Sequence, residues 1–590
     1  MKFLKKNYAY ICMSVCFLFL LWRAFKGFCW SDESFYISTT DRFFRGEIPL
    51  VDEWFRTQMS SLILVPFYAL YVLIAGSNAG IILYFRLLYL VFSLVAALVT
   101  YRVLKKDYPD HVAVVPALFL MCYAHLNNAT FSYYMLSCLF TELALILIYD
   151  HNTTKKKAEL FVAGILIALG VLCMPLFAAG YALIMLALFA ALFAKRFLPL
   201  PRRIKETIDS EKLVKISVYT IAGIALCAVS FMIYIFSRMD LKYLLETLPY
   251  ALVDNEHNES LGYFIRKPNR CLTEVFGTYI TYASYLLIAV SFLFQKILKK
   301  HPFREISVGA AIIIFILMSY KAFGHTGYMQ VVFFMFMIPV YFVSEKKNAG
   351  LFWLMSVPAV LVALIYCFAS SDFLYVMAIG AAIGTPAGVC ALYDLVRIKD
   401  EEDKADAKTG SSVRILGIAL TLVCLYALGT TFALRLVNVY RDAPVTRLTR
   451  RIPSGIAKGL YTTDEHLEMY DDVYETIDEF CSKDGGNILF SKILPWGYLA
   501  TDMRCAYPTT WRATAYDKDQ LDLYYKINPD QKPDMIVVLD EQYGSYDAAG
   551  DTEDDHNPNL DEMSDYWKDY ISSEGFTETR VKCGKIYRRK

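Results

Sequence analysis

Several signatures of soluble and nucleic-acid-binding proteins are missing from this sequence. It has 14 cysteines but no Cys-x-x-Cys pair and no spacing typical of a zinc site. No domain or stripe rich in Lys and Arg with interleaved aromatic residues is present, so nothing indicates nucleic acid as a partner. Charge of one sign is also lacking, because 59 basic residues nearly balance 58 acidic ones. No small-x-small motif follows the apolar N-terminal stretch, so we expect a retained first helix rather than a cleaved signal peptide.

What the chain has in excess is long apolar runs. Hydrophobic residues make up 56% of it and the mean hydropathy is +0.37, whereas soluble domains contain about 45–50% apolar residues. The runs extend from Tyr8 to about Leu436, and each approaches the roughly 20 residues needed to cross a hydrocarbon core. We therefore expect an α-helical polytopic membrane protein, with a membrane domain over residues 1–437 and a soluble domain over 438–590.

Lysine and arginine predict the orientation of these helices, because cytoplasmic loops are enriched in both. Lys2, Lys5 and Lys6 place the N-terminus in the cytoplasm. The basic loops then all fall inside if the short run 61–75 is a juxtamembrane or re-entrant segment rather than a full span. This gives about thirteen spans and an extracytoplasmic C-terminal domain. The loops expected outside are 30–60, with juxtamembrane helices, 238–272 and 320–328.

The C-terminal part reads as a small α/β domain. Residues 463–482 have the periodicity of an amphipathic helix, and Asn487–Ile493, Met535–Leu539 and Arg580–Tyr587 read as strands. Residues 540–566 are rich in Asp, Glu, Gly and Asn and read as a solvated loop. A set of aromatic residues fits the core of such a domain better than an exposed sugar-binding face: Trp496, Tyr498, Trp511, Tyr524 and Tyr525.

The first outer loop carries an acidic pair, Asp32 and Glu33, directly after the first apolar run. Ser31 is placed to cap a helix that starts there, and acidic residues in a first turn suit the helix dipole. Ordinary capping is therefore a sufficient structural explanation of the pair. The helix would turn Phe35, Tyr36, Thr39 and Phe43 toward the membrane or the bundle, and Gly46 and Pro49 would end it.

In this position the sequence Asp32-Glu33-Ser34-Phe35-Tyr36, followed by Gly46 and Pro49, resembles the first outer loop of the GT-C class of membrane glycosyltransferases. It is most similar to the protein O-mannosyltransferases and the aminoarabinose transferases of lipid A, which have an Asp-Glu-x-x-Tyr element there. Two features differ: Phe35 stands where some relatives have a basic residue, and Arg56-Thr-Gln-Met-Ser-Ser61 replaces the usual Pro-Pro or Lys-Pro.

The resemblance implies transfer of a sugar from a polyprenyl phosphate to a hydroxyl of a glycan, lipid or protein acceptor, on the outer face of a plasma membrane that we expect to be bacterial. Asp32 is the expected base, and Glu33 a helper or structural acid. The departing phosphate requires fixed cations. Arg86 lies within an apolar run, where a charge is functional by default or snorkels to the interface. The candidate substrate-binding residues are Tyr36, Arg56, Gln58, Arg86, Arg270, Lys321 and His325.

A second outer loop contains Asp254, Glu256 and His257. These residue types together could hold a divalent metal such as Mg or Mn, and oligosaccharyltransferases, which share the GT-C class, use outer-loop acids on a metal. The aminoarabinose and mannosyl branches are not known to require one. A solvated polar loop explains the same residues without a cofactor.

Two other functional classes remain open. A transporter or flippase of a lipid-linked glycan would span the membrane equally often, but such proteins often show internal repeats and ionisable residues at mid-span. We find no repeat, and the charges considered above gather near the outer interface. A non-catalytic protein of cell-envelope assembly is the third class, and it would tolerate the loss of Asp32.

Overall fold

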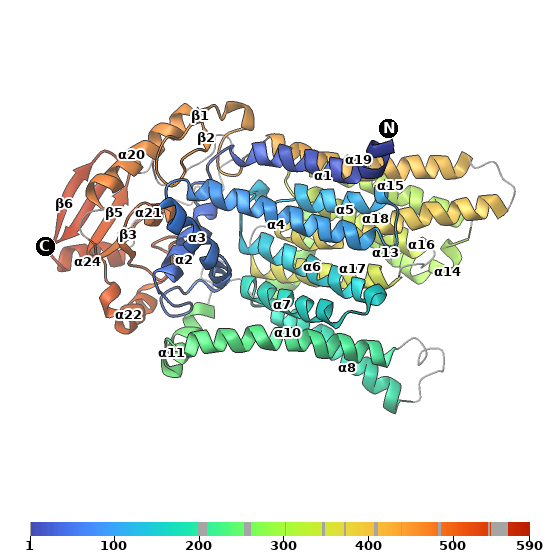
Figure 1. The fold of residues 1–590 in the computed structure, drawn as a ribbon, viewed down its shortest axis with the longest axis horizontal. Helices are drawn as coiled ribbons and strands as arrows, with labels where there is room; N and C mark the ends of the chain where they lie inside the picture. The colour runs from blue at the N-terminus through green and yellow to red at the C-terminus, as the bar shows by residue number, and fades with distance from the viewer. Residues whose placement is uncertain are drawn as a thin grey trace.

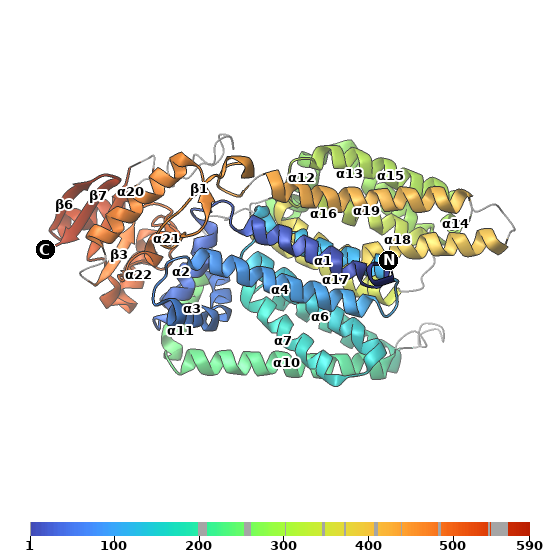
Figure 2. The ribbon, with the colours of Figure 1, turned by 45° about the horizontal axis from the view of Figure 1, so that its top comes forward.

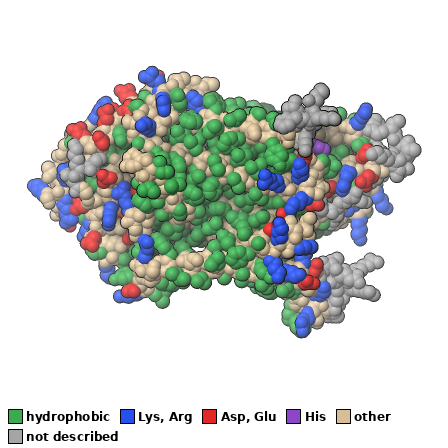
Figure 3. Space-filling model, in the orientation of Figure 1, with side chains coloured by type: hydrophobic (Ala, Val, Ile, Leu, Met, Phe, Trp, Pro, Cys, Tyr) green, Lys and Arg blue, Asp and Glu red, His purple; other side chains and the backbone are tan. Residues whose placement is uncertain are grey.

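The computed structural model describes residues 2–198, 209–252, 261–300, 302–344, 349–370, 373–405, 411–437, 439–481, 485–540, 543 and 565–590. The molecule is elongated, with a bundle of long helices at one end and the C-terminal domain at the other (Figure 1). Hydrophobic side chains cover the middle of the bundle, and Lys and Arg gather toward the two ends (Figure 3). This distribution is that of a protein that spans a membrane.

Within the described residues, nine helices are long and apolar enough to cross a membrane, or eleven if two bent helix pairs each count as one span. The predicted class, a helical membrane protein with a small α/β C-terminal domain, is confirmed. The expected count of about thirteen spans is larger, because helices α5 and α16 are apolar but short. The bundle helices are α1 (Lys2–Ala24), α4 (Ile81–Leu104), α5 (Asp110–Cys122), α6 (Tyr133–Thr154), α7 (Lys157–Cys173), α8 (Phe177–Phe197), α10 (Ser210–Phe236), α13 (Thr278–Leu293), α14 (Gln295–Leu298), α15 (Phe303–Ala322), α16 (Tyr328–Val343), α17 (Ala349–Ala369), α18 (Phe373–Ala405) and α19 (Ser411–Val437).

The loops divide between the two ends of the bundle as their charge predicts. The basic segments 102–106, 155–157 and 296–300 lie at the end away from the C-terminal domain (Figures 1 and 2). The first outer loop lies at the domain's end, as do helices α11 (Leu241–Leu252) and α12 (Leu261–Phe276). The bundle therefore has one basic end and one end that carries the folded domain.

The first outer loop folds into α2 (Asp32–Phe44), the 3-10 helix η1 (Arg56–Ile63) and α3 (Val65–Ala75), with a bend of 53° between the last two. The side chains expected to face the membrane or the bundle from α2, Phe35, Tyr36, Thr39 and Phe43, are all buried within the protein. Ser31 occupies the N-cap position but its side chain accepts no capping hydrogen bond. Its hydroxyl donates to Asp32 Oδ2 at 2.8 Å.

The C-terminal domain is a five-stranded mixed sheet with strand order β4-β3-β5-β7-β6. β3 pairs in parallel with β4 and β5, whereas β7 pairs antiparallel with β5 and β6. A short antiparallel pair, β1 and β2, precedes the sheet. The elements are β1 (Arg450–Arg451), β2 (Tyr461–Thr462), α20 (Asp464–Phe480), β3 (Asn487–Phe490), α21 (Pro495–Leu499), β4 (Arg504–Cys505), α22 (Lys518–Ile527), β5 (Met535–Leu539), α24 (Asp565–Ser573), β6 (Phe576–Val581) and β7 (Gly584–Arg589).

Four residues of the predicted aromatic core of this domain are buried, Trp496, Tyr498, Tyr524 and Tyr525, whereas Trp511 is half-buried and packs on Phe35 of the first outer loop. Trp496 and Tyr524 are fully buried, and the rings of Trp30 and Trp496 meet edge to face with centroids 5.0 Å apart. Trp54 donates its backbone N–H to Pro508 O at 2.8 Å. The domain thus holds the outer loop in place by packing on it. Of the predicted solvated loop 540–566, residues 541–542 and 544–564 lie outside the described residues.

Candidate functional site

Asp32 lies where α1 has ended and α2 begins, at the end of the bundle that meets the C-terminal domain (Figures 1 and 2). Its side chain is 23% exposed, and Oδ2 lies 3.5 Å from Arg441 Nε. Arg441 follows α19, so the pair joins two segments that are 409 positions apart in sequence. A partly exposed carboxylate beside an arginine combines a proton acceptor and a fixed positive charge at one place.

Asp442 links the backbone segment before Asp32 to the one after Arg441. Its carboxylate accepts hydrogen bonds from the backbone N–H groups of Phe28 and Ala443, both at 2.7 Å. His466 Nδ1 lies 2.8 Å from the same carboxylate. Arg441 itself adopts a left-handed backbone conformation with φ of 52°, which is strained for a residue with a side chain and is found often at functional sites. The contacts of Asp442 thus hold the backbone next to Arg441 in place.

A small cavity, with room for about one water molecule, lies beside this pair. Three buried arginines line it, Arg23 from α1, Arg86 from α4 and Arg435 from α19. Arg435 Nη1 donates to the backbone oxygen of Asn127 at 3.0 Å, whereas its Nε has no hydrogen-bond partner. An unpaired buried guanidinium donor costs free energy unless an acceptor reaches it. The other lining residues are Ala24, Cys29, Asn127, Asn128, Ala129, Val439 and Tyr440.

Glu33 is fully buried and pairs with Arg86 in a bidentate arrangement. Arg86 Nε and Nη2 donate to the two carboxylate oxygens of Glu33, both at 2.6 Å. Arg86 Nη1 also donates to the backbone oxygen of Ala24 at 2.9 Å. Each Glu33 oxygen therefore accepts a hydrogen bond from a guanidinium nitrogen. This ion pair links α2 to α4, which is a structural role.

Tyr36, one helical turn after Asp32 on α2, begins a chain of tyrosine ring contacts. The rings of Tyr36 and Tyr133 meet edge to face at 5.9 Å, and Tyr133 stacks on Tyr134 with centroids 4.0 Å apart. Burial, followed by the charge of Asp32, raises the pKa of Tyr36 well above its ordinary value. Tyr36 therefore remains a neutral phenol next to the carboxylate, available as a hydrogen-bond donor.

The remaining predicted binding residues occupy other places. Gln58 is buried on η1 against α2, where Ser61 Oγ donates to its Oε1 at 3.3 Å, and Arg56 begins the same helix. Arg270 Nε lies 2.5 Å from Glu274 on α12. Lys321 is exposed near the end of α15, and His325 stacks on Tyr328 at 4.8 Å. Their predicted roles toward the substrate stay predictions.

The predicted metal ligands Asp254, Glu256 and His257 lie outside the described residues. In the described part of the chain, no group of three or more His, Cys, Asp and Glu side chains is arranged to hold a metal ion. Asp32 and Glu33 each face an arginine, and a positive partner competes with a cation for the carboxylate.

Sequence reasoning missed Arg23, Arg435 and Arg441. The rule that singled out Arg86, a charge within an apolar run, applies equally to Arg23 near the end of α1 and to Arg435 near the end of α19. Arg441 follows the last apolar run and carries no such signal. Its place beside Asp32 depends on how α1 and α19 meet in three dimensions.

Comparison with known proteins finds no matching family model and no matching curated protein. Among solved structures, the chain has distant similarity to the archaeal oligosaccharyltransferase AglB from Archaeoglobus fulgidus in complex with an inhibitory peptide and a dolichol-phosphate, with 10% identity and a TM-score of 0.47 over 90% of this chain and 69% of that chain. The apo form gives 13% identity and 0.46 over 91% and 70%. The form tethered to an acceptor peptide gives 12% and 0.46 over 100% and 75%. Similarity at this level does not assign the chain to a family.

Proposed function

We propose that this protein is a glycosyltransferase that moves a sugar from a polyprenyl-phosphate donor to a hydroxyl acceptor on the outer face of the membrane. The observation that carries the proposal is the ion pair of Asp32 with Arg441, whose neighbour in sequence, Tyr440, lines the cavity that contains three buried arginines. A carboxylate that accepts a proton and cations that receive a phosphate are the two groups that this reaction requires.

The donor's apolar tail would lie in the bilayer, so its phosphate would reach the protein at the membrane interface. Arg435, whose Nε lacks a partner, and Arg441 are the proposed phosphate contacts. Arg23 adds positive charge behind them, whereas the charge of Arg86 is already balanced by Glu33. Arginine suits this role, because its planar group donates several hydrogen bonds to phosphate oxygens and keeps its charge when buried.

In the proposed step the acceptor hydroxyl transfers its proton to Asp32 while its oxygen attacks the anomeric carbon. The bond between that carbon and the phosphate oxygen breaks, and the electron pair leaves with the polyprenyl phosphate. The arginines stabilise the negative charge that grows on the leaving oxygen. Tyr36 and Tyr133 offer aromatic faces to the sugar or the acceptor.

The test is transfer from a panel of radiolabelled polyprenyl-phosphate sugars, measured in membranes that contain wild-type protein or Asp32→Asn at equal abundance. We expect the variant to lose about 100-fold or more in rate, because the amide keeps the size but accepts no proton. Transfer that survives in Asp32→Asn would contradict the proposal for this residue.

Asp464→Asn is the matched control. Asp464 also starts a helix, α20, and its Oδ1 lies 2.7 Å from Arg450 Nε, but its side chain is 79% exposed. The control removes a helix-start carboxylate and an ion pair without touching the site, so it should transfer at the wild-type rate. Transfer by neither wild type nor control from any donor would favour the transporter alternative.

A further inference from the structure

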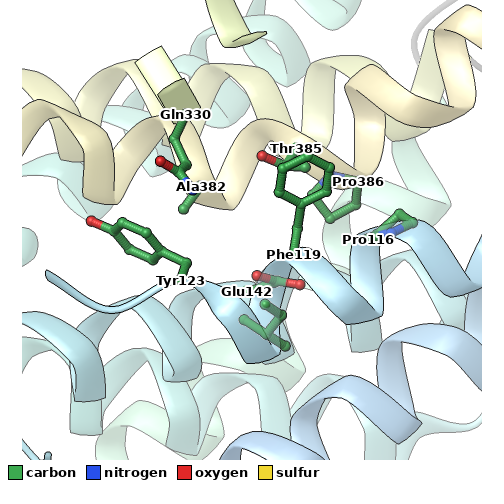
Figure 4. Close-up of a pocket in the computed structure, with 9 residues that line it drawn as sticks. Pro116, Phe119, Tyr123, Glu142, Gln330, Ala382, Thr385 and Pro386 are labelled. Carbon is green, nitrogen blue, oxygen red and sulfur yellow. The ribbon is translucent and has the colours of Figure 1, made fainter. Parts of the chain in front are cut away.

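A second cavity lies deep in the bundle, between α5, α6, α16 and α18 (Figure 4). Glu142, near the middle of α6, lines it and is 2% exposed. Its nearest described polar contact is Thr100 Oγ1 at 3.4 Å from Oε1, and no Lys or Arg forms an ion pair with it in the described part of the chain. A carboxylate without a basic partner at such a depth is costly and marks a functional site by default.

The other polar atoms around the cavity are oxygens. Gln330 Nε2 donates to Thr431 Oγ1 at 3.0 Å, which leaves Gln330 Oε1 buried without a partner. The hydroxyl of Tyr123 is likewise buried and unpaired. Thr385 Oγ1 donates to Ala381 O at 3.2 Å and keeps its lone pairs. Figure 4 shows the Gln330 amide and the Thr385 hydroxyl on one side of the space and the carboxylate of Glu142 on the other, with the side chain of Phe119 reaching in between.

A proline supplies one more acceptor. Pro386 lies inside α18 and has no N–H, so the carbonyl of Ala382, four residues earlier, loses its helical hydrogen bond. Ala382 and Pro386 both line the cavity, and Pro116 interrupts α5 on the opposite side in the same way. Backbone carbonyls without a helical partner coordinate the coupling ions of transporters, and α18, although continuous, has such a carbonyl at Ala382.

We propose that the Glu142 cavity binds one sodium ion. Carboxylate, amide, hydroxyl and carbonyl oxygens form a donor set for a hard cation. The charge favours a monovalent ion, since Glu142 alone would neutralise Na⁺ but would leave a divalent ion with an uncompensated charge inside the membrane. The cavity has room for about one water molecule, which suits an ion that has shed most of its hydration shell.

The first experiment measures binding of ²²Na⁺ to the purified full-length protein, with choline chloride holding the ionic strength constant. We expect about one bound ion per chain and, by linkage, a rise in Tm of about 2 °C or more when roughly 100 mM sodium replaces choline. No bound ²²Na⁺ in wild-type protein would overturn the proposal. A Tm that rises on acidification but ignores sodium would overturn it in favour of a protonated Glu142.

Variants locate the ion. Glu142→Gln keeps the shape, removes the charge, and should lose both ²²Na⁺ binding and the sodium-dependent rise in Tm. Thr385→Val should weaken binding about 10-fold, whereas Ser93→Ala, which deletes a buried unpaired hydroxyl of α4 away from the cavity, should leave it unchanged. Undiminished binding in both Glu142→Gln and Thr385→Val would refute this position. Asp32→Asn should bind sodium normally, so this result is independent of the proposed transferase activity.

Discussion

The two carboxylates of the acidic pair, Asp32 and Glu33, have different surroundings, although the residues are neighbours in sequence. Glu33 faces inward to a bidentate partner and is fully buried, while Asp32 stays partly open beside Arg441. The sequence indicated that Asp32 and Glu33 matter and proposed Asp32 as the base. It could not tell that Arg86 would be engaged by Glu33, because the two lie on different helices.

Removing one partner of the Glu33–Arg86 pair should destabilise the protein strongly. We expect Glu33→Leu or Arg86→Met alone to cost about 3–5 kcal/mol in the free energy of unfolding, since each leaves an uncompensated buried charge, and the double variant to recover much of the loss. Unfolding of the purified variants in denaturing detergent measures this. Losses that simply add in the double variant would show that the two side chains are not coupled. Transfer activity in a stable double variant would rule out Arg86 as a phosphate ligand.

Among the helices, periodicity and charge predicted the long apolar elements and the amphipathic α20 well. The strands are predicted less exactly. Met535–Leu539 matches β5, and Asn487–Ile493 begins with β3 but runs three residues past its end. The segment predicted as one strand over Arg580–Tyr587 contains the end of β6, the turn at 582–583 and the first four residues of β7. Gly584, with φ of 155° and Val538 O only 2.0 Å from where a Cβ would lie, begins β7 at that turn. In the sequence, Gly584 is one glycine within a segment where apolar and polar residues alternate, and this alone does not predict that the chain reverses direction there.

Two glycines let α7 and α10 approach at backbone contact. A Cβ on Gly164 would lie 2.1 Å from Thr220 O, and one on Gly223 would lie 2.2 Å from Phe161 O. We expect Gly164→Val to push these helices apart and to cost about 1–3 kcal/mol, measured as a fall in Tm. Gly309→Val in α15 is the control, because a Cβ there meets nothing within 4 Å and the helix-propensity change is the same. Equal falls in both variants would mean that the close approach contributes nothing.

At the scale of the whole molecule, the interface between the outer loop and the C-terminal domain contains a buried charge cluster. Arg42 Nη1 donates to Glu53 at 2.8 Å and its Nε to Glu47 at 2.5 Å, so one guanidinium serves two carboxylates. Asp52 Oδ1 accepts from Gln531 Nε2 of the C-terminal domain at 3.1 Å. Burial raises the pKa of Glu53 from 4.5 to about 7.

This shift makes the stability depend on pH in a defined direction. Between the two pKa values, 4.5 and about 7, the folded protein holds a proton on Glu53 that the unfolded chain has released. The free energy of unfolding should therefore fall as pH rises through this window. Thermal unfolding followed from about pH 5 to pH 8 should show a flatter profile for Glu53→Gln than for wild type. Glu465→Gln, an exposed residue of α20, should keep the wild-type slope, and the same slope in all three proteins would contradict this role.

The positions of Asp32 and Arg441 in the sequence also determine when, during synthesis of the chain, this ion pair can form. Asp32 is synthesised within the first tenth of the chain, whereas Arg435 is made near the end of the last bundle helix, α19, and Arg441 only after it. The backbone N–H groups of Phe28 and Gly27 likewise gain their acceptors, Asp442 and the backbone oxygen of Tyr461, only late in synthesis. A chain made only as far as α18 therefore holds Asp32 without Arg435 and Arg441, the phosphate contacts that we propose, so the proposed transfer would require synthesis to have passed α19.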